Sequence, residues 1–340
     1  MPAHEALSQA LLEAVRAQRF GVAAGEAFPS LDLAVVQFRR GRAPRWANVL
    51  FSREHPRGVA AAIGANAGPV QNIRFDADQQ DTRGDSVAWL PGSDWARLAW
   101  RPLFGTGPHR FVAPYPASLL KLMVAVGVGL AVDAGRCAWP DALEPMIVVS
   151  DNEATDRCVA LLHRVGMVDP LNERLLALQL PTLQLNRTTP RGGWRNGDGS
   201  GVGHIHMTAW DTARLLWLLD RDAPQAPWLP AGTELLKPAS RDHLRGVLAR
   251  QQLDHILSSD SLRGLPGWVA GLPGAPAFAH KTGNTDNYAS DAGIVRTPDA
   301  HYLIAVLTSL GKRHAPHPAC ATVWELPALG AAVHALMAAA

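Results

Sequence analysis

The order of helix and strand patterns along the 340 residues constrains the fold more than any other feature of this chain. Segments rich in β-branched and aromatic residues, which are typical of strands, lie near both ends, at residues 31–40, 46–54, 277–283, 290–297 and 301–310. Between them, residues 118–257 read as a succession of helices, most of which open on a Ser, Thr or Asp suited to capping. Short links between the late strands predict antiparallel pairing.

This order predicts an α+β fold, in which an antiparallel sheet flanked by N- and C-terminal helices is interrupted by an all-helical domain. We expect a discontinuous sheet domain of residues 1–117 and 262–340, a helical domain of residues 118–261, and an active site in the cleft between them. The flanking helices are expected within residues 1–20 and 326–340. Residues 55–110 give no clear pattern beyond short strand-like pieces such as 71–77.

Composition excludes several classes of function. A hydrophobic content of 47%, a charged content of 18% and a net charge of +2 without basic runs indicate a globular protein that binds no nucleic acid. No segment reaches the ~18 apolar residues of a membrane span. The first 20 residues lack a signal-peptide pattern, which predicts a cytoplasmic protein, or a periplasmic one if a leader precedes them. We expect no cofactor and no metal, and nothing in the sequence indicates an oligomeric state.

The cysteines are three in number and lack the spacing of metal ligands. They are Cys137, Cys158 and Cys320. We expect reduced, packed thiols, and a Cys137–Cys158 disulfide stays open as the alternative.

Lys121 interrupts the apolar run "YPASLLKLMVAV", and it is one of only four lysines in the chain. Ser118 lies three residues earlier, so on a helix the two side chains share one face, about 5–6 Å apart at Cβ. A buried lysine beside another cation loses proton affinity, and a neutral Lys121 would accept the proton of Ser118 and make it a nucleophile. The alternative is a lysine whose amine reaches solvent from a buried helix beside an ordinary N-cap serine.

Two further short motifs contain residues suited to the same chemistry. Ser150, Asp151 and Asn152 stand directly before a predicted helix, where Ser150 and Glu153 also fit a capping box. In "HKTG", Lys281 and Gly283 share one face of a strand and Thr282 takes the other. Lys281 would bind a substrate carboxylate and depress the pKa of Lys121, and Gly283 would let substrate approach closely. An edge-strand lysine that blocks aggregation is the alternative.

The three motifs occur in the order Ser-x-x-Lys, Ser-Asp-Asn, Lys-Thr-Gly, and in this the sequence resembles class A β-lactamases and penicillin-binding proteins. The longer stretches "MIVVSDNEATD" and "HKTGNTDNYASDAGIV" are also similar to class A sequences. The resemblance runs from about Phe111 to the C-terminus and implies the β-lactamase/transpeptidase-like form of the predicted fold.

The resemblance also implies a role for each motif residue. Ser118 would be the nucleophile, Lys121 the base and Ser150 the proton shuttle to the leaving group. Asn152 would position the substrate, and its carboxylate would bind to Lys281 and Thr282. The oxyanion hole would consist of the backbone N–H groups of Ser118 and of Asn284, which follows Gly283.

Two departures from the class A pattern concern deacylation and the shape of the cleft. Class A enzymes carry a glutamate that activates the deacylating water, and the corresponding stretch "LQLNRTTPRGGWRNGDGSG" has none. Glu153 and Glu173 belong to predicted helices, which leaves Asp198, His204 and His206 as possible substitutes. Ser118 and Ser150 are closer in sequence than is usual in class A, which predicts a more open site. Trp194 and Trp268 are candidates for lining the cleft, although packing is the commoner role.

The leading hypothesis is therefore a serine hydrolase of class A β-lactamase type that acylates readily, with poor or unproven turnover of penicillins and the efficiency of deacylation left open. Its substrate would be a small-molecule or peptide-like acyl compound. The alternatives are a D,D-peptidase, esterase or acyltransferase of the penicillin-binding superfamily, or a non-catalytic relative that only binds ligand.

Overall fold

The computed structural model describes residues 3–18, 28–82, 86–88, 94–194, 204–253, 257, 277–311 and 321–338. A six-stranded sheet with the order β3–β2–β1–β11–β10–β9 forms its centre, and all neighbouring strands pair antiparallel. The strands are β1 (Leu31–Phe38), β2 (Arg45–Phe51), β3 (Val59–Ala60), β9 (Ala277–Asn284), β10 (Ala289–Arg296) and β11 (His301–Thr308). The early and late strands thus meet at the β1–β11 pair, as the predicted fold class requires.

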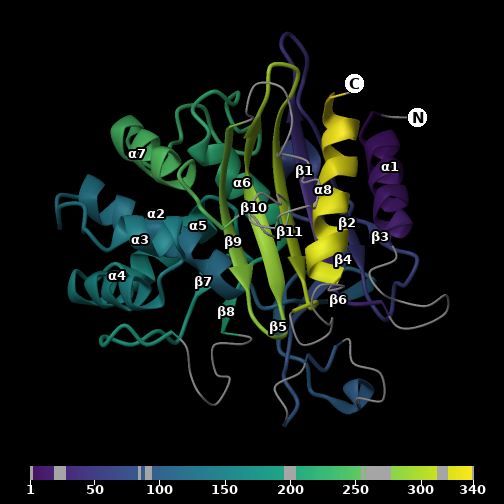
Figure 1. The fold of residues 1–340 in the computed structure, drawn as a ribbon, viewed down its shortest axis with the longest axis horizontal. Helices are drawn as coiled ribbons and strands as arrows, with labels where there is room; N and C mark the ends of the chain where they lie inside the picture. Colours follow the sequence, from purple (N-terminus) through teal and green to yellow (C-terminus); the bar gives the residue numbers. More distant parts are fainter. Residues whose placement is uncertain are drawn as a thin grey trace.

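Both faces of this sheet are buried, because helices cover each of them. On β1, Leu33 and Val35 pack against α1 (Ala3–Ala17) and α8 (Ala321–Ala338), whereas Ala34 and Val36 face the opposite core. Figure 1 shows α1 and α8 side by side on one side of the sheet and the other helices on the opposite side. The terminal helices and the antiparallel sheet confirm the α+β fold class.

The helical part of the molecule surrounds α2, which is apolar on all sides and buried along nearly its whole length. The helices are α2 (Lys121–Asp133), α3 (Leu143–Val148), α4 (Asn152–Arg164), α5 (Val168–Ala177), α6 (Ala209–Leu219) and α7 (Pro238–Leu248). Gly135 ends α2 with φ of +67°, at the predicted position. The helix expected to start at Ser118 begins at Lys121 instead, after a 3₁₀ turn, and the segment expected to be helical to residue 257 ends at Leu248.

Two smaller sheets and three 3₁₀ turns are the other elements of the described ranges. One sheet has the order β5–β4–β6, with β4 and β6 parallel, and the other pairs β7 with β8. These elements are β4 (Ile73–Ala77), β5 (Pro102–Phe104), β6 (His109–Ala113), β7 (Gln184–Leu185), β8 (Ile205–His206), η1 (Ala65–Ala67), η2 (Trp95–Arg97) and η3 (Ala117–Leu120). β4 agrees with the strand expected at 71–77, and β6 leads directly into η3, which contains Ser118.

The cysteines in the described part of the chain are free thiols. Cys137 is partly exposed and Cys158 is buried. Burial raises the pKa of the Cys158 thiol to about 12, so that it stays protonated and unreactive near neutral pH. The alternative of a Cys137–Cys158 disulfide is therefore wrong, and Cys320 lies outside the described residues. No helix within the described ranges has the length and apolar character needed to cross a membrane.

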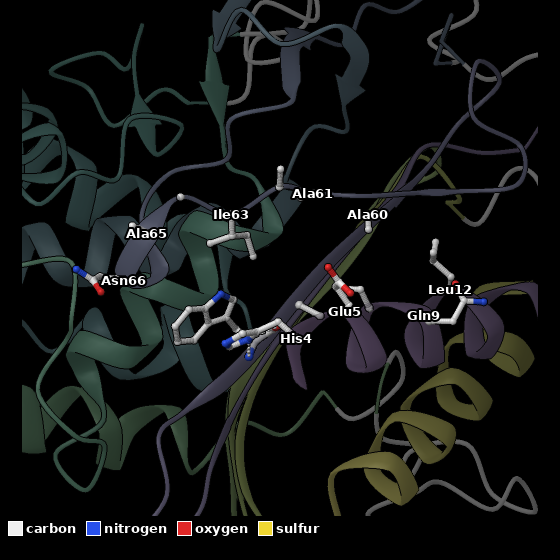
Figure 2. A pocket seen from close by; sticks show the side chains of 14 residues that line it. His4, Glu5, Gln9, Leu12, Ala60, Ala61, Ile63, Ala65 and Asn66 are labelled. Atoms are coloured by element: carbon white, nitrogen blue, oxygen red, sulfur yellow. Dashed lines mark hydrogen bonds between the residues drawn. The ribbon is translucent and has the colours of Figure 1, made fainter. Parts of the chain in front are cut away.

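A pocket of about 540 Å³ lies where α1 meets the edge of the large sheet. Figure 2 shows His4, Glu5, Gln9 and Leu12 on the α1 side of this pocket, opposite the segment around Ile63. None of the candidate site residues lines it, so it is separate from the expected cleft.

Asp32 links the large sheet to the helical part. Its Oδ2 accepts a hydrogen bond from the backbone N–H of Ala209, the first residue of α6, at 2.8 Å. Its Oδ1 accepts one from Nδ2 of Asn48 on β2 at 2.6 Å. Burial raises the pKa of the Asp32 carboxyl to about 6. This side chain therefore fixes the N-terminus of α6 from a strand that is distant in sequence.

We predict that Asp32→Ala lowers the free energy of unfolding at pH 5 by about 2 kcal/mol, because the N–H of Ala209 loses its acceptor. Asp32→Asn keeps an oxygen at that position and should lose less. Urea unfolding of the two variants measures the difference. Equal stability of Asp32→Ala and the wild type would contradict the role of Asp32 in capping α6.

We also predict a pH dependence of stability from Asp32. Its folded-state pKa of about 6 exceeds the ordinary value of 3.8, so between these values the folded protein binds more protons than the unfolded chain. The contribution of Asp32 is therefore fully present below pH 3.8 and is lost as the pH rises through 6. Relative to Asp32→Asn, the wild type should lose on the order of 3 kcal/mol between pH 4 and pH 7 in urea unfolding. A constant difference across this range would contradict the raised pKa.

Candidate active site

Ser118 lies in the 3₁₀ turn η3 and is partly exposed, while its neighbours on both sides are buried. Ala117, directly before it, has φ of +52°, a conformation that non-glycine residues rarely adopt. The turn is fixed from the sheet side, because Oγ of Ser290 on β10 donates a hydrogen bond to the carbonyl of Pro116 at 2.6 Å. The strained backbone of Ala117 thus lies directly before Ser118, the residue whose side chain the turn must orient.

Gly283 brings β9 against the same turn. A Cβ atom at this position would lie 2.5 Å from the carbonyl oxygen of Pro116 and 2.7 Å from the backbone nitrogen of Leu119. Both neighbours are backbone atoms, so they cannot move aside cheaply. The glycine of the third motif is therefore required for the close approach of β9 to η3, in addition to any approach of substrate.

Lys121 is fully buried at the start of α2. Its Nζ donates hydrogen bonds to the carbonyl of Ser150 at 2.6 Å, to Oγ of Ser150 at 3.0 Å and to Oδ1 of Asn152 at 2.8 Å. The lysine therefore does not reach solvent from its helix, as the alternative interpretation required. Its Nζ also lies 5.6 Å from the ring centroid of Trp194, which is buried.

The side chain of Ser150 bonds to Lys121 and does not cap α4. The N-cap of α4 is Asp151, whose side chain accepts from the N–H of Ala154 at 2.5 Å. The expected capping box of Ser150 and Glu153 is therefore wrong. Ser150 has φ of +56°, and this unusual backbone conformation accompanies the position of its hydroxyl beside Lys121.

Lys281 approaches Ser150 from β9 and is also fully buried. Its Nζ donates to Oγ of Ser150 at 3.0 Å and to the carbonyl of Thr282 at 2.8 Å. Burial, followed by the neighbouring charge of Lys121, holds the pKa of Lys281 well below its usual value. Although β9 is an edge strand, Lys281 is not an exposed residue that protects the edge.

The hydroxyl of Ser150 joins two lysines that are far apart in sequence, because it accepts hydrogen bonds from Nζ of both Lys121 and Lys281. Lys121 adds Asn152 to this group through a separate hydrogen bond to its Oδ1. Asn152 is exposed, Thr282 is buried, and Asn284 is partly exposed at the end of β9, opposite Ala289 of β10. No hydrogen bond joins the Ser118 hydroxyl to Lys121 among those that the described residues form. Ser118 is placed near these residues by its backbone, because the turn η3 packs closely against Gly283.

The candidates for activating water fall in different places. Asp198 lies outside the described residues, as does Trp268, a candidate for lining the cleft. His206 is buried, and its Nδ1 lies 2.9 Å from the carbonyl of Thr182; burial lowers the pKa of His206 to about 4. His204, just before β8, is partly exposed. No group of three or more His, Cys, Asp or Glu side chains that could hold a metal ion occurs in the part of the chain that the structure describes.

Sequence reasoning missed the supporting residues of the site. Ser290 lies inside the quoted stretch "HKTGNTDNYASDAGIV", but only the strand register, with Ser290 opposite Gly283, shows that it reaches Pro116. His280 and Asp291, which form a buried pair beside Lys281, were missed for the same reason.

Comparisons with known proteins extend these observations. The model of a family described as the beta-lactamase enzyme family matches residues 133–326, more than half of the chain. The match includes Ser150, Asn152 and residues 281–284 and begins after Lys121. A search of curated proteins gives no match.

Solved structures with the same fold include a structure of PBP-A, with 17% identity, a TM-score of 0.56 and coverage of 97% of this chain and 96% of that chain. A class A beta-lactamase representative from Bacteroides cellulosilyticus has 15% identity, a TM-score of 0.58 and coverage of 98% and 99%. A beta-lactamase from Sphaerobacter thermophilus has 17% identity, a TM-score of 0.56 and coverage of 97% of both chains. At these identities the similarity establishes a shared fold and does not establish a shared function.

We predict that Gly283→Ala lowers the free energy of unfolding by about 2 kcal/mol, because the new methyl group meets Oγ of Ser290 and backbone atoms of Pro116 and Leu119. Gly246→Ala is the control, since in α7 the nearest atom to its Cβ is the flexible Arg250 side chain at 3.8 Å. That control should be neutral or slightly stabilising. Urea unfolding measures both, and a Gly283→Ala variant as stable as Gly246→Ala would contradict the close contact of β9 with η3.

Proposed function

Because the chain belongs to the beta-lactamase enzyme family, we propose that it is a serine hydrolase that forms an acyl-enzyme on Ser118. The substrates would be β-lactams or related small amides and esters, including peptide-like ones. The observation that carries this proposal is the hydroxyl of Ser150, which contacts the buried amines of both Lys121 and Lys281 at 3.0 Å.

The first step of the proposed reaction is attack by Ser118. Its proton passes to the amine of Lys121 while Oγ bonds to the substrate carbonyl carbon. A neutral amine is needed for this step, and two buried amines that share one hydroxyl disfavour holding two positive charges. Burial and the proximity of Lys281 therefore support Lys121 as the base.

Breakdown of the tetrahedral intermediate requires a proton for the leaving nitrogen. The Ser150 hydroxyl would give this proton as the carbon–nitrogen bond breaks, and it would regain one from the lysine beside it. Because Ser150 contacts both lysines, a proton can move between the two amines through this one hydroxyl. The acyl group then remains as an ester on Ser118.

Binding and charge stabilisation would come from the residues around this centre. The N–H groups of Ser118 and Asn284 would form the oxyanion hole, and the loss of one such donor typically costs about 3 kcal/mol in the barrier. Asn152 is exposed and already bonded to Lys121, which suits an amide that positions substrate beside the base. Lys281 and Thr282 would bind a substrate carboxylate.

Release of the acyl group is the slow step in this proposal. The stretch in which class A enzymes carry the water-activating glutamate has none in this chain. His206 is no replacement, because it is buried and its Nδ1 is engaged by Thr182. A variant of the structural neighbour PBP-A is known as an acyl-enzyme complex with penicillin G, so this fold can hold such an adduct.

We predict that incubation with penicillin gives a mass increase equal to one penicillin on Ser118, and that the adduct persists for many minutes. Intact-mass spectrometry followed by peptide mapping measures this, and a chromogenic ester serves as a second probe. Ser118→Ala should remove the adduct. Absence of an adduct with both probes in the folded wild type would favour a ligand-binding relative, whereas rapid turnover would show that another group activates water.

Lys121→Met should slow acylation of Ser118 by about 10²-fold or more, because the variant keeps much of the side-chain volume and loses the base. Lys237→Met is the matched control, since Lys237 is an exposed lysine bonded to the carbonyl of Asp133. The rate of mass increase measures both variants after circular dichroism has shown that they fold. Undiminished labelling of Lys121→Met would remove Lys121 from the base role.

A further inference from the structure

A buried histidine–aspartate pair lies beside Lys281 and takes no part in the proposed reaction. Nδ1 of His280, the residue before Lys281, lies 2.9 Å from Oδ1 of Asp291 on β10. The exposed fractions of the two side chains are 1% and 0%. Oδ2 of Asp291 accepts a hydrogen bond from the N–H of Leu257 at 3.2 Å. Each carboxylate oxygen of Asp291 is therefore held by a nitrogen.

The strand register sets the relation between this pair and Lys281. Ala292 of β10 is opposite Lys281, and Asp291 is one position away, opposite Thr282. Because side chains alternate along a strand, His280 and Asp291 lie on the face opposite to that of Lys281. The carboxylate of Asp291 thus lies across the sheet from the side chain of Lys281.

The surroundings of Lys281 shift its pKa in opposite directions. Burial and the charge of Lys121 lower the pKa of Lys281, and the charge of Asp291 opposes this effect. His280 adjoins Lys281 on β9 and contacts Asp291, and it also stacks on Phe278 with ring centroids 3.9 Å apart. Asp291 is thus the group on β10 that favours the protonated form of Lys281.

We propose that the His280–Asp291 pair positions Lys281: it fastens strand β9 to β10 from the face opposite to that of Lys281, and it sets a carboxylate across the sheet from the side chain of Lys281. Among the strands that the structure describes, β9 pairs with β10 alone, so a displacement of β9 would move the amine of Lys281 away from Ser150. The inference rests on the proposed function only in that it takes Lys281 as a residue of the active site.

The pair would also influence substrate choice. A protonated Lys281 attracts a substrate carboxylate, whereas a neutral ester gains little from that charge. The pair should therefore matter more for carboxylate-bearing substrates such as penicillins than for neutral esters. A residue that only stabilised the fold would affect both substrate classes equally.

The scarcity of lysine allows a direct test that does not depend on acylation. The chain has only four lysines, so labelling with [ε-¹³C]lysine gives four NMR signals, and Lys281→Met identifies that of Lys281. We expect the titration midpoint of Lys281 to fall by about one pH unit in Asp291→Asn. An unchanged midpoint in a folded Asp291→Asn variant would overturn the proposal.

Asp220→Asn is the matched control, because Asp220 pairs with His301 at the other end of the sheet. His301 is opposite Arg296, five positions along β10 from Asp291, which is roughly 16 Å at 3.3 Å per residue. Asp220→Asn should leave the Lys281 midpoint unchanged. An equal shift in both aspartate variants would also overturn the proposal, since it would show a general effect of charge.

Variants of His280 provide a second test if Asp291→Asn does not fold. In His280→Asn the amide Nδ2 can take the place of the ring Nδ1, so the Lys281 midpoint should stay at its wild-type value. In His280→Leu, Asp291 loses this hydrogen-bond partner and β9 loses this link to β10, so the midpoint should fall as in Asp291→Asn. Identical midpoints in the two variants would contradict the proposal. Since the lysine signals are read without substrate, a failure of Ser118 to become acylated is a separate result.

Discussion

The contact of two buried lysines with one hydroxyl is the interaction on which the rest of the structure depends. Two buried amines beside one hydroxyl disfavour holding two positive charges, and their contact requires that the fold hold both side chains in place. Here Lys121 is held by the buried helix α2, Lys281 by the paired strand β9, and Ser150 by the segment before α4. The helical part and the sheet must therefore pack against each other at these three residues.

The sheet topology makes that meeting possible. Pairing of β1 with β11 joins the early and late strands in one sheet, and the late strands β9 and β10 lie beside η3, the turn that leads into α2. Some of the local conformations that conflict with ordinary preferences lie at this place. Ala117 and Ser150 have positive φ values, and Gly283 leaves no room for a side chain. Such conflicts are expected where a fold holds reactive groups in a set geometry.

The sequence predicted the fold class and the three short motifs, because periodicity and motif order are local properties of the chain. It could not show that Asp151 caps α4 while Ser150 is left to the lysines, since Ser150 and Asp151 both suit a cap. It also could not show that Ser290 and Asp291 of one strand support opposite faces of the site, because that follows from the register of β10 with β9. Such features depend on which strands pair and in what register, and a short stretch of sequence does not contain that information.

The central claim is that Ser118, Ser150 and the two lysines form one reactive centre. The most direct measurement is a crystal structure of the protein after reaction with a penicillin. The account predicts continuous density from Oγ of Ser118 to the acyl carbon, with the acyl oxygen within reach of the N–H groups of Ser118 and Asn284. An adduct on a different residue, or a Ser150 hydroxyl out of reach of either lysine, would contradict it.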